Sequence, residues 1–421
     1  MNVTIDRNLT LIACTICQMT KPTKILKDFG LLLTGNFGAQ FISLLFYPIL
    51  VRIFSPNDFG LFGTFSSILV IGSIFASGQL HLAFIKCQDD SEIDELYWLF
   101  KIFILFGTLI VSILAALINF RFQYFPNWYS SLFPFSIWAY LNFEGQKMLA
   151  VRAEKFGNMS RAVSINRLLS NVSKIGLGKF FATPVILITS EVLTNTLSYL
   201  LIKKNISINS KRPNSIKVLL KKYMDFPLFA TLSSFFQLGL TEFPVLFLAL
   251  YYSQKEIGPY VLSLRLLLQP LSVIGNSLGS VVSKKIVKNH INNISSRKMV
   301  LQIYTSYILI GFVLFFTIKI MPNQWFVYIL GENWANFKEI LLPMSLLCSA
   351  KLSSGLHIYY YVAINQVRVK SIWKAVQLTS VIGIIVLYSH FPLVHVLWIA
   401  GSIEAIIDLA FITYTISFRA N

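Results

Sequence analysis

The sequence predicts an all-α membrane protein that crosses the bilayer many times. Twelve long apolar stretches, joined by short loops, cover most of the 421 residues. Hydrophobic residues make up 55% of the chain and charged residues only 13%, so little sequence is left for a water-soluble domain. The 36 lysines and arginines gather in alternate loops, which is typical of a polytopic protein with a fixed orientation.

Each apolar stretch is long enough to be a transmembrane helix. At ~1.5 Å per residue, about 20 residues cross the ~30 Å hydrocarbon core. We expect about 12 transmembrane helices, arranged as two six-helix bundles around a central cavity. In chain order the expected spans are residues 29–51, 60–85, 99–120, 128–150, 161–181, 184–202, 227–250, 258–282, 299–320, 338–360, 371–389 and 393–416.

A faint internal repeat divides the spans into two sets of six. Asp28 and Asp225, each before a phenylalanine, are 197 residues apart, and Gly60 and Gly258 are 198 apart. Because six is even, the second set enters the membrane in the same orientation, related to the first by a pseudo-two-fold axis along the membrane normal. The predicted organisation is a cytoplasmic N-terminal segment (1–28), a six-helix bundle (29–202), a basic cytoplasmic connector (203–224), a second six-helix bundle (225–416) and a cytoplasmic C-terminus (417–421).

The basic residues give the predicted orientation. With the N-terminus inside, 26 of them lie at the inner face, seven at the outer face and three within spans. By the positive-inside rule both termini are therefore cytoplasmic. This sidedness accounts for the net charge of +18, which in a soluble protein would suggest nucleic acid as a partner. The residues expected outside are Arg52, Arg121, Lys174, Lys179, Lys255, Lys319 and Lys338.

The sequence indicates neither an enzyme nor a cofactor or metal site. Cys14 and Cys17 have no second Cys or His cluster that would complete a metal site, and the four cysteines give no disulfide framework. There is no phosphate-binding P-loop, HExxH motif or serine elbow. The acidic run at 89–95 could hold Mg²⁺ with a nucleotide-sugar, but its short loop has no room for a nucleotide fold, which favours a solvated loop.

Charged residues inside the spans are the candidate functional residues, because a charge in hydrocarbon is costly and must face protein or water. Arg265 lies seven residues into its span, too deep to reach the interface easily. Glu242, on the preceding span, lies at about the same depth. Two alternatives follow: Arg265 binds an anionic substrate, or it forms a buried ion pair with Glu242.

The second predicted bundle holds further charges. Lys351 lies mid-span without an acid one turn away, so it faces either a ligand or a group on another helix. Glu404 and Asp408 are four residues apart and share one helix face, which suits ion coupling or pairing with a neighbouring helix.

Two glutamates of the first bundle differ in their expected partners. Glu144 and Lys147, three residues apart, are expected to pair, whereas Glu191 has no partner visible in the sequence.

Several stretches resemble a known family. They are Leu50–Phe62 (LVRIFSPNDFGLF), Val151–Phe156 (VRAEKF), Lys221–Ala230 (KKYMDFPLFA), Ile257–Gly279 (IGPYVLSLRLLLQPLSVIGNSLG) and Gly331–Trp334 (GENW). They are similar to the Wzx-type polysaccharide-unit flippases of the multidrug/oligosaccharidyl-lipid/polysaccharide (MOP) exporter superfamily. The resemblance covers nearly the whole chain from about Lys24.

The resemblance implies a function. Flippases of this type translocate O-antigen or capsule repeat units on undecaprenyl pyrophosphate across the bacterial inner membrane, through a cationic central cavity and commonly with ion coupling. Membrane lipid and, as partners, polysaccharide polymerase and chain-length machinery are implied, and nucleic acid is not. Arg265 falls within a matching stretch, whereas Lys351, Glu404 and Asp408 match no motif. Glu242 departs from the uncharged polar residue that the resemblance leads us to expect.

Two other functions stay open at this point. A drug or small-molecule antiporter of the same superfamily would favour acidic residues facing the cavity, and Arg265 and Lys351 argue against it. A polysaccharide polymerase or ligase would be expected to carry a large outer loop, whereas the longest outer loop here is about residues 319–337.

Overall fold

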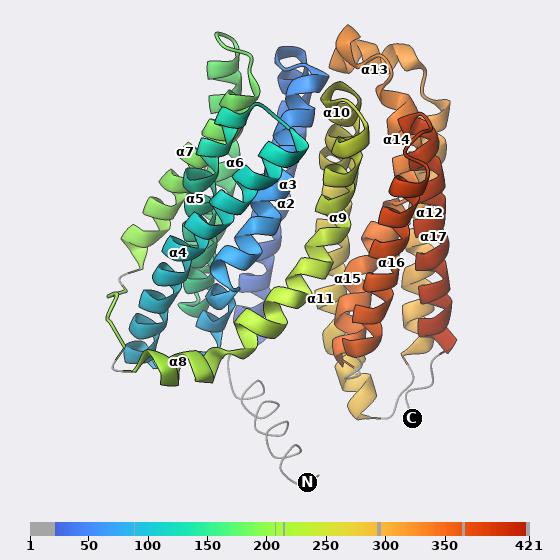
Figure 1. Cartoon of the computed structure of the whole chain (residues 1–421). Coiled ribbons are helices and arrows are strands. Elements are labelled where there is room, and N and C mark those ends of the chain that lie inside the picture. The colour runs from blue at the N-terminus through green and yellow to red at the C-terminus, as the bar shows by residue number, and fades with distance from the viewer. Residues whose placement is uncertain are drawn as a thin grey trace.

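Helices arranged in two bundles make up the protein. The computed structural model describes residues 22–417 except 88, 207, 214, 293–295 and 364–366, and within this part the chain forms helices and no β-strand. In Figure 1 the bundles stand side by side, with α9 and α10 between them. We call them the N-lobe and the C-lobe, and we name the two ends of the molecule the α13 end and the α8 end after the short helices found there.

The N-lobe follows the predicted spans up to the connector. Its elements are α2 (Pro22–Ile53), α3 (Pro56–Ser77), the short 3-10 helix η1 (Leu80–Ile85), α4 (Asp90–Phe122), the 3-10 helix η2 (Asn127–Leu132), α5 (Phe133–Arg152), α6 (Phe156–Gly178) and α7 (Pro184–Asn205).

The C-lobe follows the connector helix α8 (Ile216–Tyr223). Its elements are the π-helical turn η3 (Phe226–Ala230), α9 (Thr231–Tyr251), α10 (Gln254–Ser263), the π-helical turn η4 (Leu264–Leu268), α11 (Gln269–Ile291), α12 (Arg297–Ile320), α13 (Asn323–Leu330), the 3-10 turn η5 (Glu332–Trp334), α14 (Phe337–Ser345), α15 (Cys348–Ala363), α16 (Val367–Leu387) and α17 (Leu393–Ser417).

Seven helices of the described chain are long and apolar enough to cross a membrane, and two shorter apolar helices accompany them. All twelve predicted stretches fall on helical chain, although the count of twelve spans stays a prediction. Two boundaries differ from expectation. The stretch at 60–85 leaves the long helix after Ser77 and ends in η1, and the stretch at 338–360 is divided between α14 and α15.

Peripheral helices turn apolar side chains outward. On α4, Leu109, Ile113 and Leu117 are each at least half exposed, and on α12 so are Phe312 and Phe316. A water-soluble protein does not expose such stripes, but hydrocarbon covers them without cost. By contrast, most of α3 is buried. The protein is therefore a multi-span membrane protein in which α3 lies at the centre.

The lobes meet closely where α3 crosses α10 near the α13 end, in a contact that we call the seam. A Cβ atom added to Gly60 would collide with the carbonyl of Gln254, and one added to Gly258 would collide with the carbonyl of Pro56. Only glycine lets the two backbones approach this closely. The seam therefore depends on the absence of side chains at these two positions.

Both seam helices begin with the same capping box. Asp58 accepts a hydrogen bond from the Ser55 N–H at 2.9 Å while the Ser55 hydroxyl accepts one from the Asp58 N–H at 3.3 Å. Ser253 and Glu256 repeat this arrangement at 3.0 and 3.4 Å. The capping residues are 198 positions apart, as are Gly60 and Gly258. The repeat visible in the sequence thus has matched helix starts in the two lobes.

Three side chains at the α13 end tie the lobes together by donating to main-chain carbonyls, and we call this set the latch. Arg52 of α2 donates to the last carbonyls of α13 at 2.5 and 3.3 Å. The Trp334 indole, 1% exposed, donates to the Val51 carbonyl at 2.8 Å. Gln254 of α10 donates to the Tyr124 carbonyl at 3.0 Å. The lobes are therefore joined at this end by hydrogen bonds in addition to the seam.

The connector, expected as a basic loop, contains α8, which lies across the bottom of the N-lobe in Figure 1. Leu219 and Tyr223 are buried against the N-lobe core. Lys222 donates to the Glu92 carboxylate at the start of α4, and this hydrogen bond raises the pKa of Lys222. The basic residues of the connector are all exposed, namely Lys203, Lys204, Lys211, Arg212, Lys217, Lys221 and Lys222.

We predict that Gly258→Ala destabilises the protein by about 1–3 kcal/mol, because the new methyl group forces α10 away from the Pro56 carbonyl. Gly383→Ala is the matched control, since a Cβ there meets nothing within 4 Å and the gain in helix propensity is the same. Thermal unfolding of both variants in detergent measures the effect. Equal melting temperatures would show that the seam tolerates a side chain.

Candidate functional site

Arg265 reaches across the seam from the C-lobe to the N-lobe. It lies in η4, the π-helical turn between α10 and α11, a feature often found at functional sites. Its half-buried guanidinium carbon sits 4.4 Å from the centroid of the Phe62 ring on α3. The aromatic face stabilises the cation without neutralising it.

A second cation approaches the same ring. Lys174 of α6 lies 5.1 Å from the Phe62 centroid, and its ammonium donates to the Glu191 carboxylate of α7 at 2.8 Å. Lys174 is only 6% exposed, so its expected place at the outer face is wrong. Glu191, whose partner is not visible in the sequence, thus pairs with Lys174 of the neighbouring helix. Lys174 can turn inward because its long stem packs along the bundle while its charge meets Glu191.

A third cation completes what we call the cationic cluster, which comprises Arg167, Lys174 and Arg265 around Phe62 and Glu191. Arg167, counted at the inner face in the sequence, is exposed midway along α6. The charges of Arg167 and Arg265 both act on Glu191. Phe62 and Glu191 line a cavity of about 30 Å³. Two guanidinium groups and an ammonium are suited to bind phosphate oxygens, the arginines through bidentate hydrogen bonds.

Glu242 does not pair with Arg265 in this structure. Its carboxylate accepts a hydrogen bond from the Ser67 hydroxyl of α3 at 2.7 Å. In the part of the chain that the structure describes, Arg265 has no carboxylate within 4 Å. Of the two alternatives that the sequence left open, the buried ion pair is therefore not formed.

Glu404 and Asp408 lie inside the C-lobe on one face of α17, as their spacing predicts. Both are buried, at 6% and 4% exposure. Glu404 accepts a hydrogen bond from the Gln377 amide at 3.2 Å, and the Gln377 carbonyl accepts one from Lys374 at 2.9 Å. Lys374, counted at the inner face in the sequence, thus belongs to the interior of the lobe.

Asp408 extends this network to α15. It accepts a hydrogen bond from the Ser353 hydroxyl at 2.9 Å, and its other oxygen lies 3.9 Å from Nδ1 of His357, which is fully buried. We call Ser353, His357, Lys374, Gln377, Glu404 and Asp408 the C-lobe network.

Lys351 belongs with the carboxylates of the C-lobe. It lines a cavity of about 20 Å³ together with Glu404, and its charge acts on Glu242 and Asp408. The structure therefore places Arg265 among cations and Lys351 among acids, although the sequence suggested the same role for both.

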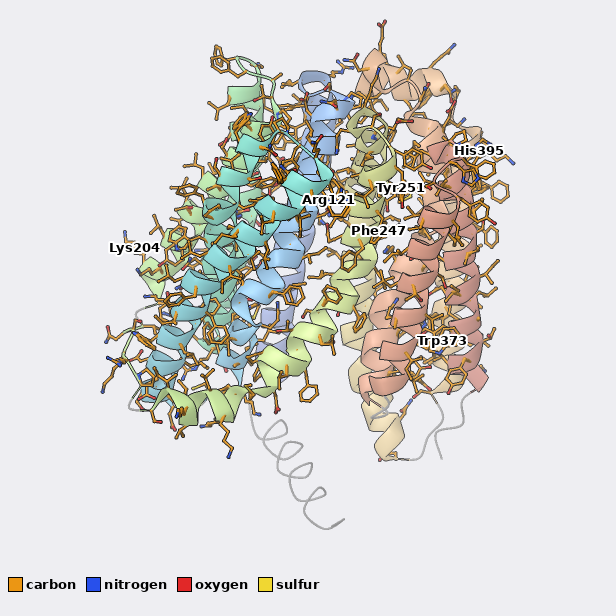
Figure 2. The ribbon with its side chains drawn as sticks, viewed as in Figure 1. Arg121, Lys204, Phe247, Tyr251, Trp373 and His395 are labelled. Atoms are coloured by element: carbon orange, nitrogen blue, oxygen red, sulfur yellow. The ribbon has the colours of Figure 1, made fainter. Side chains whose placement is uncertain are left out.

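Aromatic rings pack beside the C-lobe network. The Phe411 ring lies 4.4 Å from that of His357 and stacks on Trp373 at 4.9 Å and on Tyr361 at 5.2 Å between centroids. Figure 2 shows Trp373 near the end of the C-lobe opposite His395, which lies toward the α13 end. These rings form an apolar layer against the buried polar groups.

A larger hollow of about 840 Å³ lies at the α13 end. It is lined by the starts of α3, α10 and α17 and by the segment around η5, with Glu256, Glu332 and Glu339 among its walls. In the described chain no group of three His, Cys, Asp or Glu side chains is placed to hold a metal ion.

Several site residues escaped the sequence reading. Lys174 and Glu191 are 17 positions apart on adjacent helices, and a search for opposite charges at equal depth on neighbouring spans would have found them. Phe62 could not have been selected from 36 phenylalanines. The predicted Glu144–Lys147 pair is confirmed at 2.6 Å.

Comparison with known proteins places this geometry in a family. A profile described as "Polysaccharide biosynthesis protein" matches residues 49–339, which include Arg265, the whole seam and the cationic cluster. The chain belongs to this family. No curated protein sequence matches the chain.

Solved structures of low sequence identity share the fold of this family member. "Lipid II flippase MurJ, inward closed conformation" is 15% identical, with a TM-score of 0.70 over 92% of this chain and 87% of MurJ. An inward-facing multidrug resistance MATE family transporter of the MOP superfamily is 13% identical, with a TM-score of 0.63 over 90% and 94%. The eukaryotic MATE transporter AtDTX14 is 11% identical, with a TM-score of 0.62 over 94% and 97%.

These likenesses confirm the predicted fold class, an all-α architecture of two helical lobes. The proteins that share the fold are transporters and flippases, not enzymes. The chain is thus a member of a polysaccharide biosynthesis family that shares its fold with a lipid II flippase and with MATE transporters.

The Lys174–Glu191 ion pair leads to a prediction about the stability of the protein. Lys174→Met removes the ammonium that pairs with the Glu191 carboxylate and is expected to cost about 1–3 kcal/mol, because a third of the Glu191 side chain is exposed. In a Glu191→Gln background the same change is expected to cost much less. A double-mutant cycle of denaturant unfolding measures the difference, with the Lys147–Glu144 pair as control. Additive effects of the two substitutions would contradict the predicted coupling.

Proposed function

We propose that the protein flips undecaprenyl-pyrophosphate-linked oligosaccharide repeat units from the cytoplasmic to the outer face of the bacterial inner membrane, for O-antigen or for capsular or exopolysaccharide synthesis. The observation that carries the proposal is the cationic cluster, in which Arg265 of one lobe and Lys174 of the other approach one ring. A pyrophosphate cannot cross hydrocarbon without such partners. The family, which is named for polysaccharide biosynthesis, supports the sugar part of the substrate.

Alternating access follows from the placement of the cluster. We assign the α8 end to the cytoplasm, with both termini, because the exposed connector lysines and arginines lie there. The seam and the latch hold the lobes together at the opposite end. A substrate that enters from the cytoplasm meets the cluster below the seam, and rocking of one lobe against the other opens the outer side.

The C-lobe network is the proposed site of ion coupling. Glu404 and Asp408 are buried beside Lys351, Lys374 and His357, so binding a proton or a metal cation changes the charge balance inside one lobe. Lys351, first considered as a second substrate ligand with Arg265, serves better here as a counter-charge. Glu242 links α9 of the C-lobe to α3 of the N-lobe through Ser67.

A small-molecule antiporter is the second candidate function. The buried carboxylates of the C-lobe and the MATE-like fold favour it. The cationic cluster favours the flippase, because a cationic drug is repelled by three basic groups.

Arg265→Ala is expected to abolish surface glycan while the protein stays inserted and expressed, and Arg265→Lys to retain part of it. In cells that carry only the alanine variant, a non-penetrating glycan-binding probe applied to spheroplasts should find complete undecaprenyl-linked units trapped on the inner face. Arg121→Ala is the control, since Arg121 is exposed at the end of α4 and its guanidinium lies over the Phe122 ring rather than the Phe62 ring. Normal glycan in Arg265→Ala would refute the substrate role. Units that reach the outer face unpolymerised would indicate a polymerase or ligase.

Asp408→Asn is expected to uncouple transport from the ion gradient but to leave binding of inorganic pyrophosphate unchanged. The reason is that Asp408 belongs to the C-lobe network, whereas pyrophosphate is proposed to bind at the cationic cluster. Flipping by proteoliposomes under imposed proton or sodium gradients measures the coupling. The exposed Asp225→Asn is the control. A gradient response equal to wild type would remove Asp408 from the coupling site.

A further inference from the structure

One carboxylate stands among the three cations of the cationic cluster. Glu191 lies 2.8 Å from the Lys174 ammonium, and the charges of Arg167 and Arg265 also act on it. The Lys174 side chain is 7% exposed, whereas that of Glu191 is 33% exposed. A structural ion pair would satisfy both partners equally, but here the acid is the more accessible one. The carboxylate can therefore leave its position at less cost than the ammonium can.

The cluster is concentrated enough to bind a single anion through two lobes. Lys174 and Arg265 lie 5.1 and 4.4 Å from the Phe62 centroid, so the two charged groups are at most about 9.5 Å apart, the two distances laid end to end. In this structure the Glu191 carboxylate, paired with the Lys174 ammonium, supplies the negative charge at this site. An anion from outside must compete with it.

Anionic lipid headgroups of the membrane compete with the substrate for the cationic cluster. The bilayer around any cationic site is rich in anionic phospholipids, and each of their phosphodiesters carries one negative charge. A pyrophosphate carries two or more. Since Coulomb attraction scales with the product of the charges, a single phosphodiester gains little by replacing a carboxylate of equal charge, whereas a diphosphate gains much more.

We propose that Glu191 is a specificity-determining residue that keeps monoanionic lipid headgroups out of the cationic cluster and yields to diphosphates. The inference rests on the proposed function, because it assigns selectivity to the same site. It is a form of discrimination against the wrong ligand, achieved by an internal competitor.

The lobe structure adds a consequence for release. Glu191 and Lys174 both belong to the N-lobe, on α7 and α6, whereas Arg265 belongs to the C-lobe. When the lobes part at the seam, Arg265 moves away with its lobe and Glu191 stays beside Lys174. The Glu191 carboxylate then pairs with the Lys174 ammonium again. The diphosphate thereby loses its contacts with both Lys174 and Arg265.

Binding of two simple probes to the purified protein in nanodiscs of zwitterionic lipid tests the proposal. The probes are inorganic pyrophosphate and dimethyl phosphate, a monoanionic diester. Wild type is expected to bind pyrophosphate in clear preference to dimethyl phosphate. Glu191→Gln is expected to raise the affinity for dimethyl phosphate by about tenfold or more, because the monoanion no longer has to displace a carboxylate of equal charge. Glu191→Asp, which keeps the charge, should bind dimethyl phosphate as weakly as wild type does.

Controls separate this inference from the proposed function. Glu144→Gln alters a different lysine–glutamate pair, Lys147–Glu144 of the N-lobe, and should leave both affinities unchanged. Thermal unfolding of each variant verifies its fold, and Glu191→Asp carries the test if Glu191→Gln does not fold. In that case stronger binding of dimethyl phosphate by Glu191→Asp than by wild type would overturn the proposal.

The outcomes are distinct. If Arg265→Ala binds pyrophosphate as well as wild type does, the cationic cluster is not the substrate site, and the proposed function fails together with the inference. If Arg265→Ala loses pyrophosphate but Glu191→Gln leaves dimethyl phosphate binding unchanged or weaker, the substrate site stands and the role of Glu191 is refuted.

Discussion

The close approach of α3 to α10 is the constraint on which the rest of the molecule depends. Gly60 and Gly258 let a carbonyl of the opposite helix occupy the space of a side chain, and this brings Phe62 of the N-lobe within reach of Arg265 of the C-lobe. Moving the helices apart by the width of a methyl group would separate the ring from the guanidinium. The seam therefore sets the geometry of the cationic cluster as well as the contact between the lobes.

Charges inside the bilayer form two groups of different balance. The basic groups that approach Phe62 outnumber the single acid Glu191, whereas the C-lobe network holds Glu404 and Asp408 against Lys351, Lys374 and a buried histidine. An excess of cations suits a polyanionic ligand. A network with nearly equal numbers of positive and negative groups suits a small ion, because binding of that ion changes the net charge of the network. Glu242, which accepts from Ser67 across the lobes, lies where the two groups could influence each other.

The sequence predicted the fold class well, because spans in hydrocarbon must be long and apolar and the repeated register at Gly60 and Gly258 marks two related halves. It also singled out Arg265 as a candidate site residue, because a basic residue deep within an apolar span can be recognised from the sequence alone. It missed the Lys174–Glu191 pair, because a contact between adjacent helices depends on how each helix is rotated, which apolar spans with weak amphipathic patterns do not reveal. The short helices α8 and α13 were assigned to loops, since eight residues give only two turns of periodicity.

The hydrogen bonds of the latch all have main-chain acceptors, and this affects which substitutions the protein tolerates. Arg52, Trp334 and Gln254 all donate to main-chain carbonyls, so none of these links depends on a second side chain. Every residue type has a main-chain carbonyl, so substitutions at the accepting positions preserve these hydrogen bonds. Substitution of a donor side chain removes its hydrogen bond. Because these links contain no ion pair, closure of this end is also insensitive to ionic strength. The α13 end can thus vary in sequence, and keep its closed form in media of changing salinity.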